Sequence, residues 1–378
     1  MAQVKPDIET FAKIKVVGVG GAGNNAVTRM VAAKIHGVDF IAVNADAQQL
    51  HHCTAPQKLL VGKNLTRGLG AGMNPDIGRQ AAEENRDEIQ DLIKGADLVF
   101  VTYGLGGGVG TGAGPVVAEA AKDAGALTVG VVTKPFAFEG VQRSRLAAAG
   151  LEQLKDRVDT LITIPNDKIL QIIDRNTSLL DAFKVVDDVL RQAVQGISDI
   201  IVTPGIVNVD FADVRAIMSD AGSALMGIGK ASGDDRASEA ARMAINSPLL
   251  EVSIDGAKGV LFNISGGQDL TMIEINETAK IITESIDPDA KVIFGAVTDE
   301  KVKKGEIKVT VIATGFGDAP QKKREEQPEE KPAPVASVPE RKPVQPVKKV
   351  QSPAFEVSQI EDEDKDWDIP AFIRRKMK

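Results

Sequence analysis

The sequence is poor in the residues that build disulfide frameworks and metal centres. Its 378 residues include one cysteine, Cys53, and three histidines, His36, His51 and His52. A single cysteine cannot form a disulfide within the chain, and three histidines at this spacing do not fit a zinc site. No neighbouring group indicates an activated thiol. We therefore interpret Cys53 as inert.

Long apolar runs and an excess of basic charge are also missing. No run approaches membrane-spanning length, and the first ten residues lack the apolar core of a signal peptide, so we expect a cytoplasmic protein. A net charge of −8 argues against a general nucleic-acid binder. The hydrophobic content of 43% is typical of a soluble globular protein, and the length allows two domains.

Glycine, by contrast, is concentrated at one place. Residues 104–114 contain seven glycines in eleven positions, between the apolar run 98–102 and Pro115. Backbone N–H groups without side chains around them can surround an anion, especially at the N-terminus of a helix. We predict that such a helix begins at Pro115. A flexible linker is the alternative, but a linker is not expected between a strand and a helix.

The first half of the chain alternates between apolar, β-branched runs and segments of helical length. This pattern predicts an α/β fold, in which a parallel sheet is covered by helices on both faces. The predicted strands cover residues 14–19, 40–43, 98–102, 127–132 and 161–164.

A long amphipathic segment from Ser178 to about Val202 predicts a connecting helix, which ends at Thr203-Pro204-Gly205. The pattern after it predicts a second, α+β domain. Its expected helices cover 211–220, 236–246 and 270–285, and its expected strands cover 259–264, 291–297 and 307–313. We expect domain boundaries of 1–177, 178–203 for the connecting helix, and 204–317.

The last part of the chain has a different composition. Residues 318–353 contain eight of the 18 prolines, and we expect a disordered tether over 318–365. Six acidic residues and one lysine follow in 361–368. Residues 366–378 then place Ile369, Phe372 and Ile373 on one helical face, which is typical of a peptide that folds on a partner.

The first predicted strand leads into Gly18-Val-Gly-Gly-Ala-Gly23, a G-x-G-x-x-G pattern. Alone, this pattern indicates NAD or FAD binding, with Asp46 available for the ribose hydroxyls, so a nicotinamide-dependent oxidoreductase stays open. That interpretation leaves the glycines of 104–114 unexplained. Two phosphate-binding turns at neighbouring strand ends suit a polyphosphate, and the absence of G-x-x-x-x-G-K-[ST] argues against an ordinary P-loop NTPase.

Residues 106–112 closely resemble the signature Gly-Gly-Gly-Thr-Gly-Thr-Gly of tubulins. Together with residues 20–25 and 208–213, they make the sequence similar to the tubulin/FtsZ family from about Ile14 to Phe316. Residues 366–376 are similar to that family's terminal adaptor-binding peptide. The resemblance implies a tubulin-like fold with a Rossmann-like GTP-binding domain, a central helix, a smaller α+β domain and a disordered tail.

The resemblance also implies an activity. It implies a GTPase that converts GTP to GDP and phosphate on assembly into head-to-tail filaments, and that builds the cytokinetic ring at the bacterial division site. The implied partners are further copies of the chain and a membrane-tethering adaptor such as the actin-like FtsA, which would bind residues 366–378. Contact with the membrane would be indirect, and no nucleic acid is implied.

The resemblance assigns nucleotide contacts to individual residues. Glu139 and Arg143 would bind the ribose and its surroundings, and Asn166, Phe183 and Asp187 would recognise guanine. On residue pattern alone, Phe183 and Asp187 are ordinary buried and exposed positions of a helix. Mg²⁺ is an expected cofactor beside GTP or GDP. The phosphates would be bound around Gly20, Gly21, Ala22, Gly23, Asn24, Asn25, Gly107, Gly108, Val109, Gly110 and Thr111.

Catalysis is implied for Asp210 and Asp213, with Asn208 just before them. In the family these residues act on the γ-phosphate of the next subunit, where they orient water. The spacing alone favours another interpretation, in which Asp210 caps a helix and Asp213 interacts with its dipole.

Two positions depart from the family pattern. Val109 stands where the family typically has threonine, which removes a hydroxyl from the phosphate-binding loop. Tyr103 stands where alanine is usual. Both changes bear on turnover rather than on fold, so a non-hydrolysing structural homologue is a second alternative.

Overall fold

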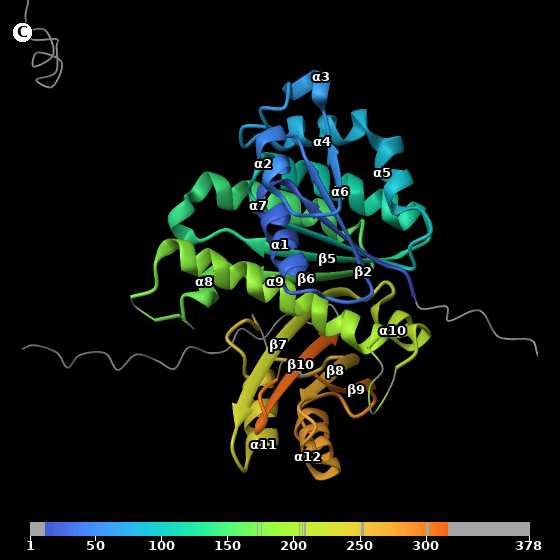
Figure 1. Cartoon of the computed structure of the whole chain (residues 1–378), viewed down its shortest axis with the longest axis vertical. Coiled ribbons are helices and arrows are strands. Elements are labelled where there is room, and N and C mark those ends of the chain that lie inside the picture. The colour runs from blue at the N-terminus through green and yellow to red at the C-terminus, as the bar shows by residue number, and fades with distance from the viewer. Residues whose placement is uncertain are drawn as a thin grey trace, which may run out of the picture. The chain divides into compact units, whose positions relative to one another are not determined.

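The computed structural model describes most of the chain up to residue 316 (Figure 1). The described residues are 12–171, 173–174, 176–203, 205, 207, 209–250, 253–299 and 302–316. The predicted tether and terminal peptide lie outside them. Within these ranges, no helix has both the length and the apolar character needed to cross a membrane.

The first half of the described chain is a parallel sheet with the strand order β3-β2-β1-β4-β5-β6. The order reverses between β1 and β4, and in doubly wound sheets ligands bind beside the carboxyl ends of the strands at such a point. The five strands predicted in this half are confirmed, and the short edge strand β3 was missed. The strands are β1 (Ile14–Val19), β2 (Val38–Asn44), β3 (Gln57–Leu60), β4 (Leu98–Gly104), β5 (Leu127–Lys134) and β6 (Thr160–Pro165).

Helices cover both faces of this sheet, because successive strand residues point to opposite sides. Val16 belongs to the core shared with α1 and α9, whereas Val17 belongs to the core shared with α4, α5, α6 and α7. The helices of this half are α1 (Gly20–Ala32), α2 (Ala47–His52), α3 (Lys63–Thr66), α4 (Pro75–Glu84), α5 (Arg86–Ile93), α6 (Gly108–Asp123), α7 (Val141–Lys155) and α8 (Asn166–Ile169).

The long helix α9 (Leu179–Val202) runs between the parallel sheet and the second half (Figure 1). It begins at Ser178, whose Oγ accepts a hydrogen bond from Asp181 N at 3.1 Å. Its apolar face contacts α1 and β5 on one side and β8 and β9 on the other. The amphipathic segment predicted from 178 to 202 is therefore this helix.

The second half is a mixed sheet in the order β7-β10-β8-β9, which continues the first through β6 and β7. β10 is antiparallel to both neighbours, and β8 and β9 are parallel. The predicted α/β fold class is thus confirmed. Its elements are α10 (Phe211–Met218), β7 (Gly222–Ser232), α11 (Arg236–Ile245), β8 (Gly259–Gly266), α12 (Met272–Thr283), β9 (Lys291–Thr298) and β10 (Glu306–Thr314).

Two features of the sequence were misread. β7 was missed because its glycines disfavour a strand. The structure explains these glycines, since a Cβ at Gly229 would lie 1.9 Å from Ala240 O, which shows that α11 packs directly on the backbone of β7. The helix predicted to begin at Pro115 begins at Gly108 instead. Close packing explains the earlier start, since a Cβ at Gly112 would lie 2.0 Å from Pro75 O of α4.

Candidate functional site

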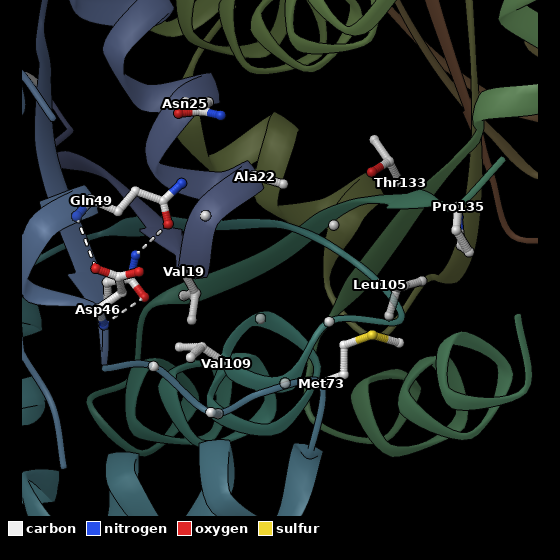
Figure 2. A pocket seen from close by; sticks show the side chains of 18 of the residues that line it. Val19, Ala22, Asn25, Asp46, Gln49, Met73, Leu105, Val109, Thr133 and Pro135 are labelled. Atoms are coloured by element: carbon white, nitrogen blue, oxygen red, sulfur yellow. Dashed lines mark hydrogen bonds between the residues drawn. The ribbon is translucent and has the colours of Figure 1, made fainter. Parts of the chain in front are cut away.

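A cavity of about 650 Å³ lies at the carboxyl ends of the parallel strands, where the strand order reverses. Figure 2 shows Asp46 and Gln49 on one side of it and Thr133 and Pro135 on the other. The predicted residues that line it are Gly21, Ala22, Asn25, Gly107, Gly108, Val109, Gly110, Glu139, Arg143, Asn166, Phe183 and Asp187.

Two helix N-termini border this cavity and touch each other. α1 begins at Gly20 and α6 at Gly108, and neither start has a side-chain cap. A Cβ at Gly20 would lie 2.8 Å from Gly110 N, so only glycine allows this approach. The first N–H groups of a helix have no partner within it and carry its positive dipole. Together the two starts form an anion-binding wall built from backbone.

Four residues predicted to contact phosphate are not among those that line the cavity: Gly20, Gly23, Asn24 and Thr111. A Cβ at Gly23 would lie 2.4 Å from Thr102 O, which brings α1 close to β4. Thr111 Oγ1 accepts a hydrogen bond from Gly106 N at 2.9 Å. These contacts hold the glycine-rich turns in place.

Asn24 is the most extensively bonded of the four. It is 1% exposed, and in the amide orientation that satisfies both of its side-chain atoms, the nitrogen donates to Gly18 O at 2.9 Å and to Gly20 O at 3.2 Å. Its amide oxygen accepts from Asn44 Nδ2 at 3.0 Å. Asn24 therefore ties the end of β1 to the end of β2 beneath the cavity.

At the other end of the cavity, two buried polar side chains lie near an aromatic ring. Asp187 is 8% exposed and its Oδ2 accepts from Arg29 Nε at 2.7 Å. Burial raises the pKa of Asp187, and the guanidinium of Arg29 opposes that rise. Asn166 is buried, and its Oδ1 has no hydrogen-bond partner among the described residues. Phe183 packs edge-on against Phe136, with ring centroids 5.5 Å apart.

Glu139 and Arg143 lie on the wall between these two ends. They form an ion pair with each other, and Glu139 Oε1 also accepts from Phe136 N at 2.9 Å. A Cβ at Gly106 would lie 2.6 Å from Arg143 Cγ, so the arginine packs on the second glycine-rich turn. The pair therefore connects the anion-binding wall to the aromatic end.

Sequence reasoning missed two parts of the wall. The first is the pair of Asn44 and Gln49 beside Asp46, which the dinucleotide interpretation had offered for the ribose hydroxyls. Gln49 N donates to Asp46 Oδ1 at 3.0 Å, and Asn44 Nδ2 donates to Gln49 Oε1 at 3.1 Å (Figure 2). The second is residues 69–73, which follow α3. Their signal was the alternating glycines at 68, 70 and 72, all with positive φ.

The predicted catalytic carboxylates lie elsewhere. Asp210 and Asp213 are exposed at the start of α10, and neither lines the cavity. Asp210 is the N-cap residue but its side chain accepts no capping hydrogen bond, so the capping interpretation of Asp210 is wrong. Asn208 lies outside the described residues. Within one chain, therefore, Asp210 and Asp213 are separate from the cavity.

Comparisons with known proteins agree with this architecture. Residues 13–174 match the model of the Tubulin/FtsZ family, GTPase domain, and residues 222–317 match that of the FtsZ family, C-terminal domain. An empty FtsZ dimer from M. jannaschii is 48% identical, with a TM-score of 0.79, and the match covers 85% of this chain and 95% of that one. A point mutant of M. jannaschii FtsZ is 50% identical, with a TM-score of 0.79, over 81% and 92% of the two chains.

A more distant solved structure shares the fold. CetZ1 from Haloferax volcanii, described as a GDP-bound monomer, is 23% identical with a TM-score of 0.70, over 82% of this chain and 96% of that one. The two family models together span most of the described residues, in the order and at the positions of the two halves of the fold. The chain therefore belongs to the tubulin/FtsZ family.

Proposed function

We propose that this chain is a GTP-dependent polymerising GTPase that forms head-to-tail filaments and builds a cytokinetic ring. The observation that carries the proposal is the cavity that joins two abutting glycine-rich helix starts to a buried pair of polar side chains. The first end suits a polyphosphate. The second suits a base with several hydrogen-bond donors.

Guanine is the base that fits the second end. It offers an N1–H and an exocyclic amine, which are donors, and adenine has no N1–H. Asn166 Oδ1, which has no hydrogen-bond partner among the residues that the structure describes, and the carboxylate of Asp187 are acceptors on the cavity wall. Phe183, which is 38% exposed, offers a ring face on which the base can stack. A nicotinamide has a carboxamide NH₂ but no ring N–H beside it, so it lacks the adjacent pair of donors that guanine offers to these acceptors, which disfavours the oxidoreductase alternative.

The remaining contacts follow from the geometry of the wall. The N–H groups around residues 20–25 and 107–111 would bind the phosphates, and Glu139 and Arg143 would lie beside the ribose. Asn25, Asp46 and Gln49 bring amide and carboxylate oxygens to the cavity. Mg²⁺ beside a nucleotide usually binds only one or two such oxygens, together with phosphate oxygens and water. Bound Mg²⁺ would neutralise phosphate charge during hydrolysis.

Hydrolysis would be completed by the next subunit. Asp210 and Asp213, with Asn208, would reach the γ-phosphate of a neighbouring chain and position the attacking water. Their exposure outside the chain's own cavity supports this role. Leu69, which lines the cavity, is 85% exposed, and Phe138, which precedes the lining residue Glu139, is 60% exposed. A heterologous contact that does not close produces a filament, and the similar M. jannaschii protein is described as a dimer.

We assign the chain's segments accordingly. Residues 1–177 would be the GTP-binding domain, 178–203 the connecting helix, 204–317 the α+β domain, 318–365 the tether and 366–378 the adaptor-binding peptide. The peptide's apolar residues would dock on a division adaptor such as FtsA, so that a cytoplasmic filament reaches the membrane indirectly at the division site.

GTP turnover measured across a range of protein concentrations tests the central claim. We expect turnover per chain to be low until assembly begins and then to rise, because each active site needs two chains. Turnover that is independent of concentration would contradict hydrolysis between subunits. Filaments without turnover would favour the non-hydrolysing homologue. Thermal protection by NADH but not by GTP would favour the oxidoreductase.

Deletion of residues 366–378 tests the tail separately. GTP turnover and filament formation should stay within twofold of the intact chain. The deletion removes neither the residues that line the cavity nor Asp210 and Asp213. Recruitment to adaptor-coated vesicles should be lost, and Phe372→Ala should remove much of it. Recruitment of the truncated chain to those vesicles would contradict the assignment.

A further inference from the structure

Tyr103 lies beneath the glycine-rich start of α6. It is the penultimate residue of β4 and is fully buried. A Cβ at Gly110 would lie 3.3 Å from Tyr103 Cβ and Cδ2, and a Cβ at Gly114 would lie 2.2 Å from Cε1. The phenol ring therefore extends along the first two turns of α6 and fills the space that a side chain at 114 would need.

This contact lies directly behind the anion-binding wall. Gly104, which follows Tyr103, lines the cavity, as do Gly108, Val109 and Gly110 of α6. On its other side, α6 is held by α4, where a Cβ at Gly112 would lie 2.0 Å from Pro75 O. The helix start is thus clamped between Pro75 and the tyrosine ring, and a change on either side would move its N–H groups.

We propose that Tyr103 is a positioning residue for the phosphate-binding helix α6. Its ring fits against α6 only because residue 114 is a glycine, so the two residues are matched in size. The ring sets the distance between α6 and β4, and so sets the position of the N–H groups of residues 108–110 relative to the cavity. This inference rests on the proposed GTP-binding function, which it deepens.

The ring, and not its hydroxyl, is the part that acts. Tyr103 Oη is buried and has no hydrogen-bond partner among the described residues. Burial also raises the pKa of Tyr103 well above its ordinary value, so the phenol stays protonated. An unpaired hydroxyl of this kind lowers stability. Phenylalanine should therefore replace tyrosine without loss of position.

A mutant cycle tests the pair, with Kd values for GTP and GDP measured on unassembled protein below the melting temperature of every variant. Tyr103→Phe should keep both Kd values within twofold. Tyr103→Ala and Gly114→Ala should each raise them about tenfold, because the displaced N–H groups of residues 108–110 would lose part of their hydrogen bonding to the charged phosphates. The double variant Tyr103→Ala/Gly114→Ala should recover most of the loss, since the added methyl group occupies part of the vacated space.

Phe262→Ala is the matched control. Phe262 is 1% exposed in β8, in the second half of the fold, where it stacks on Phe294. Its truncation should lower the melting temperature as much as Tyr103→Ala does, while the Kd values stay unchanged. Should Tyr103→Ala fail to fold, Tyr103→Leu and Phe262→Leu replace the two alanine variants.

Two results would overturn the inference. The first is a Tyr103→Ala protein with wild-type Kd values and a lowered melting temperature, which would make the ring ordinary core. The second is a double variant with no better affinity than either single variant, which would disprove the size match. Failure of the wild-type protein to bind GTP is a different result and would contradict the proposed function itself.

Discussion

The glycines of α6 and those of β7 have similar packing but different consequences. In β7, Gly227 and Gly229 face α11, and a Cβ on either would lie within 2.0 Å of a backbone oxygen. Gly112 of α6 meets α4 in the same way. Near the start of α6, however, Gly107 has open space and borders the cavity. The cavity end of α6 is therefore distinguished by a helix N-terminus that borders the cavity, and not by its glycine content.

Each half also contains an arginine that is paired with carboxylates, and the two arginines differ in their surroundings. Arg236 of α11 is 6% exposed and bonds two carboxylates, Asp269 at 2.7 Å and Glu274 at 2.5 Å. Arg29 of α1 bonds the single carboxylate of Asp187, which lines the cavity. The second half pairs its buried charge internally, whereas the first half places a buried carboxylate on a cavity wall.

The largest expected effect follows the loss of one carboxylate in the second half, which should impair hydrolysis but leave nucleotide binding in the first half unchanged. Asp213→Ala should lower GTP hydrolysis about 10²–10³-fold, as loss of a positioned acid–base group does, with the Kd for GTP within twofold. Filaments of the variant should persist longer, and the variant should reduce wild-type turnover in mixtures. Glu239→Ala, a first-turn residue of α11, is the control. A raised Kd with normal turnover per bound GTP would contradict the assignment.

The two kinds of glycine can be compared directly by adding one methyl group to each. Gly112→Ala and Gly229→Ala should both lower the free energy of unfolding, by about 1–3 kcal/mol, because each forces backbone apart. Only Gly112→Ala should also weaken GTP binding, since it moves α6. Denaturant unfolding and equilibrium binding measure the two effects. Equal losses of GTP affinity would show that the two halves do not separate in function.

The sequence allowed most of the fold to be predicted. Buried strands such as β1 and β4 were predictable because each is a continuous apolar run in the sequence. β7 was missed because its glycines are explained only by the helix packed against them, which lies later in the chain. The start of α6 was placed too late for a similar reason. Its glycines disfavour a helix when the sequence is considered alone, but Gly112 is needed there because α4 packs directly against it.

The site was predictable where it is made of continuous motifs. The glycine-rich turns follow strands and could be located from the sequence alone, whereas Asn166, Phe183 and Asp187 were found through the family resemblance. The network of Asn44 and Gln49, and residues 69–73, were missed because their position on the wall depends on how α2 and α3 fold back beside β2. No local pattern encodes that arrangement.

The two arginines allow a third test. Arg236→Met should lower the melting temperature by about 5 °C, with GTP affinity unchanged. Hydrogen bonds from Arg236 lower the pKa values of Asp269 and Glu274, so their stabilisation is present above the unfolded-state values of about 4. It is lost as the pH falls through the lowered pKa values. Thermal unfolding between pH 2 and 7 should therefore show a smaller acid-induced loss in the variant.

Arg29→Met should lower the melting temperature less than Arg236→Met does, but it should weaken GTP binding, which Arg236→Met leaves unchanged. The pKa of Asp187 is already raised by burial, and removal of Arg29 raises it further. In the proposed site guanine would bind to the ionised carboxylate, so the variant should lose GTP affinity at a higher pH than the wild type as the pH falls. GTP Kd values between pH 5 and 8 measure this. A pH profile identical to that of the wild type would show that Arg29 does not control the charge of Asp187.

The smallest expected effect concerns a single hydroxyl on the wall itself. Val109 is 8% exposed and lines the cavity at the start of α6, beside the abutting start of α1. Val109→Thr would add a donor there, and hydrogen bonds to charged groups contribute about 1.5–3 kcal/mol when well aligned. We expect hydrolysis to rise about tenfold at most, with a smaller change in Kd, because in the proposed site the backbone N–H groups would already bind the phosphates. Turnover above the assembly concentration measures the gain. Val109→Ala, which removes volume without adding a hydroxyl, is the control, and an equal gain in that variant would attribute the effect to space rather than to hydrogen bonding.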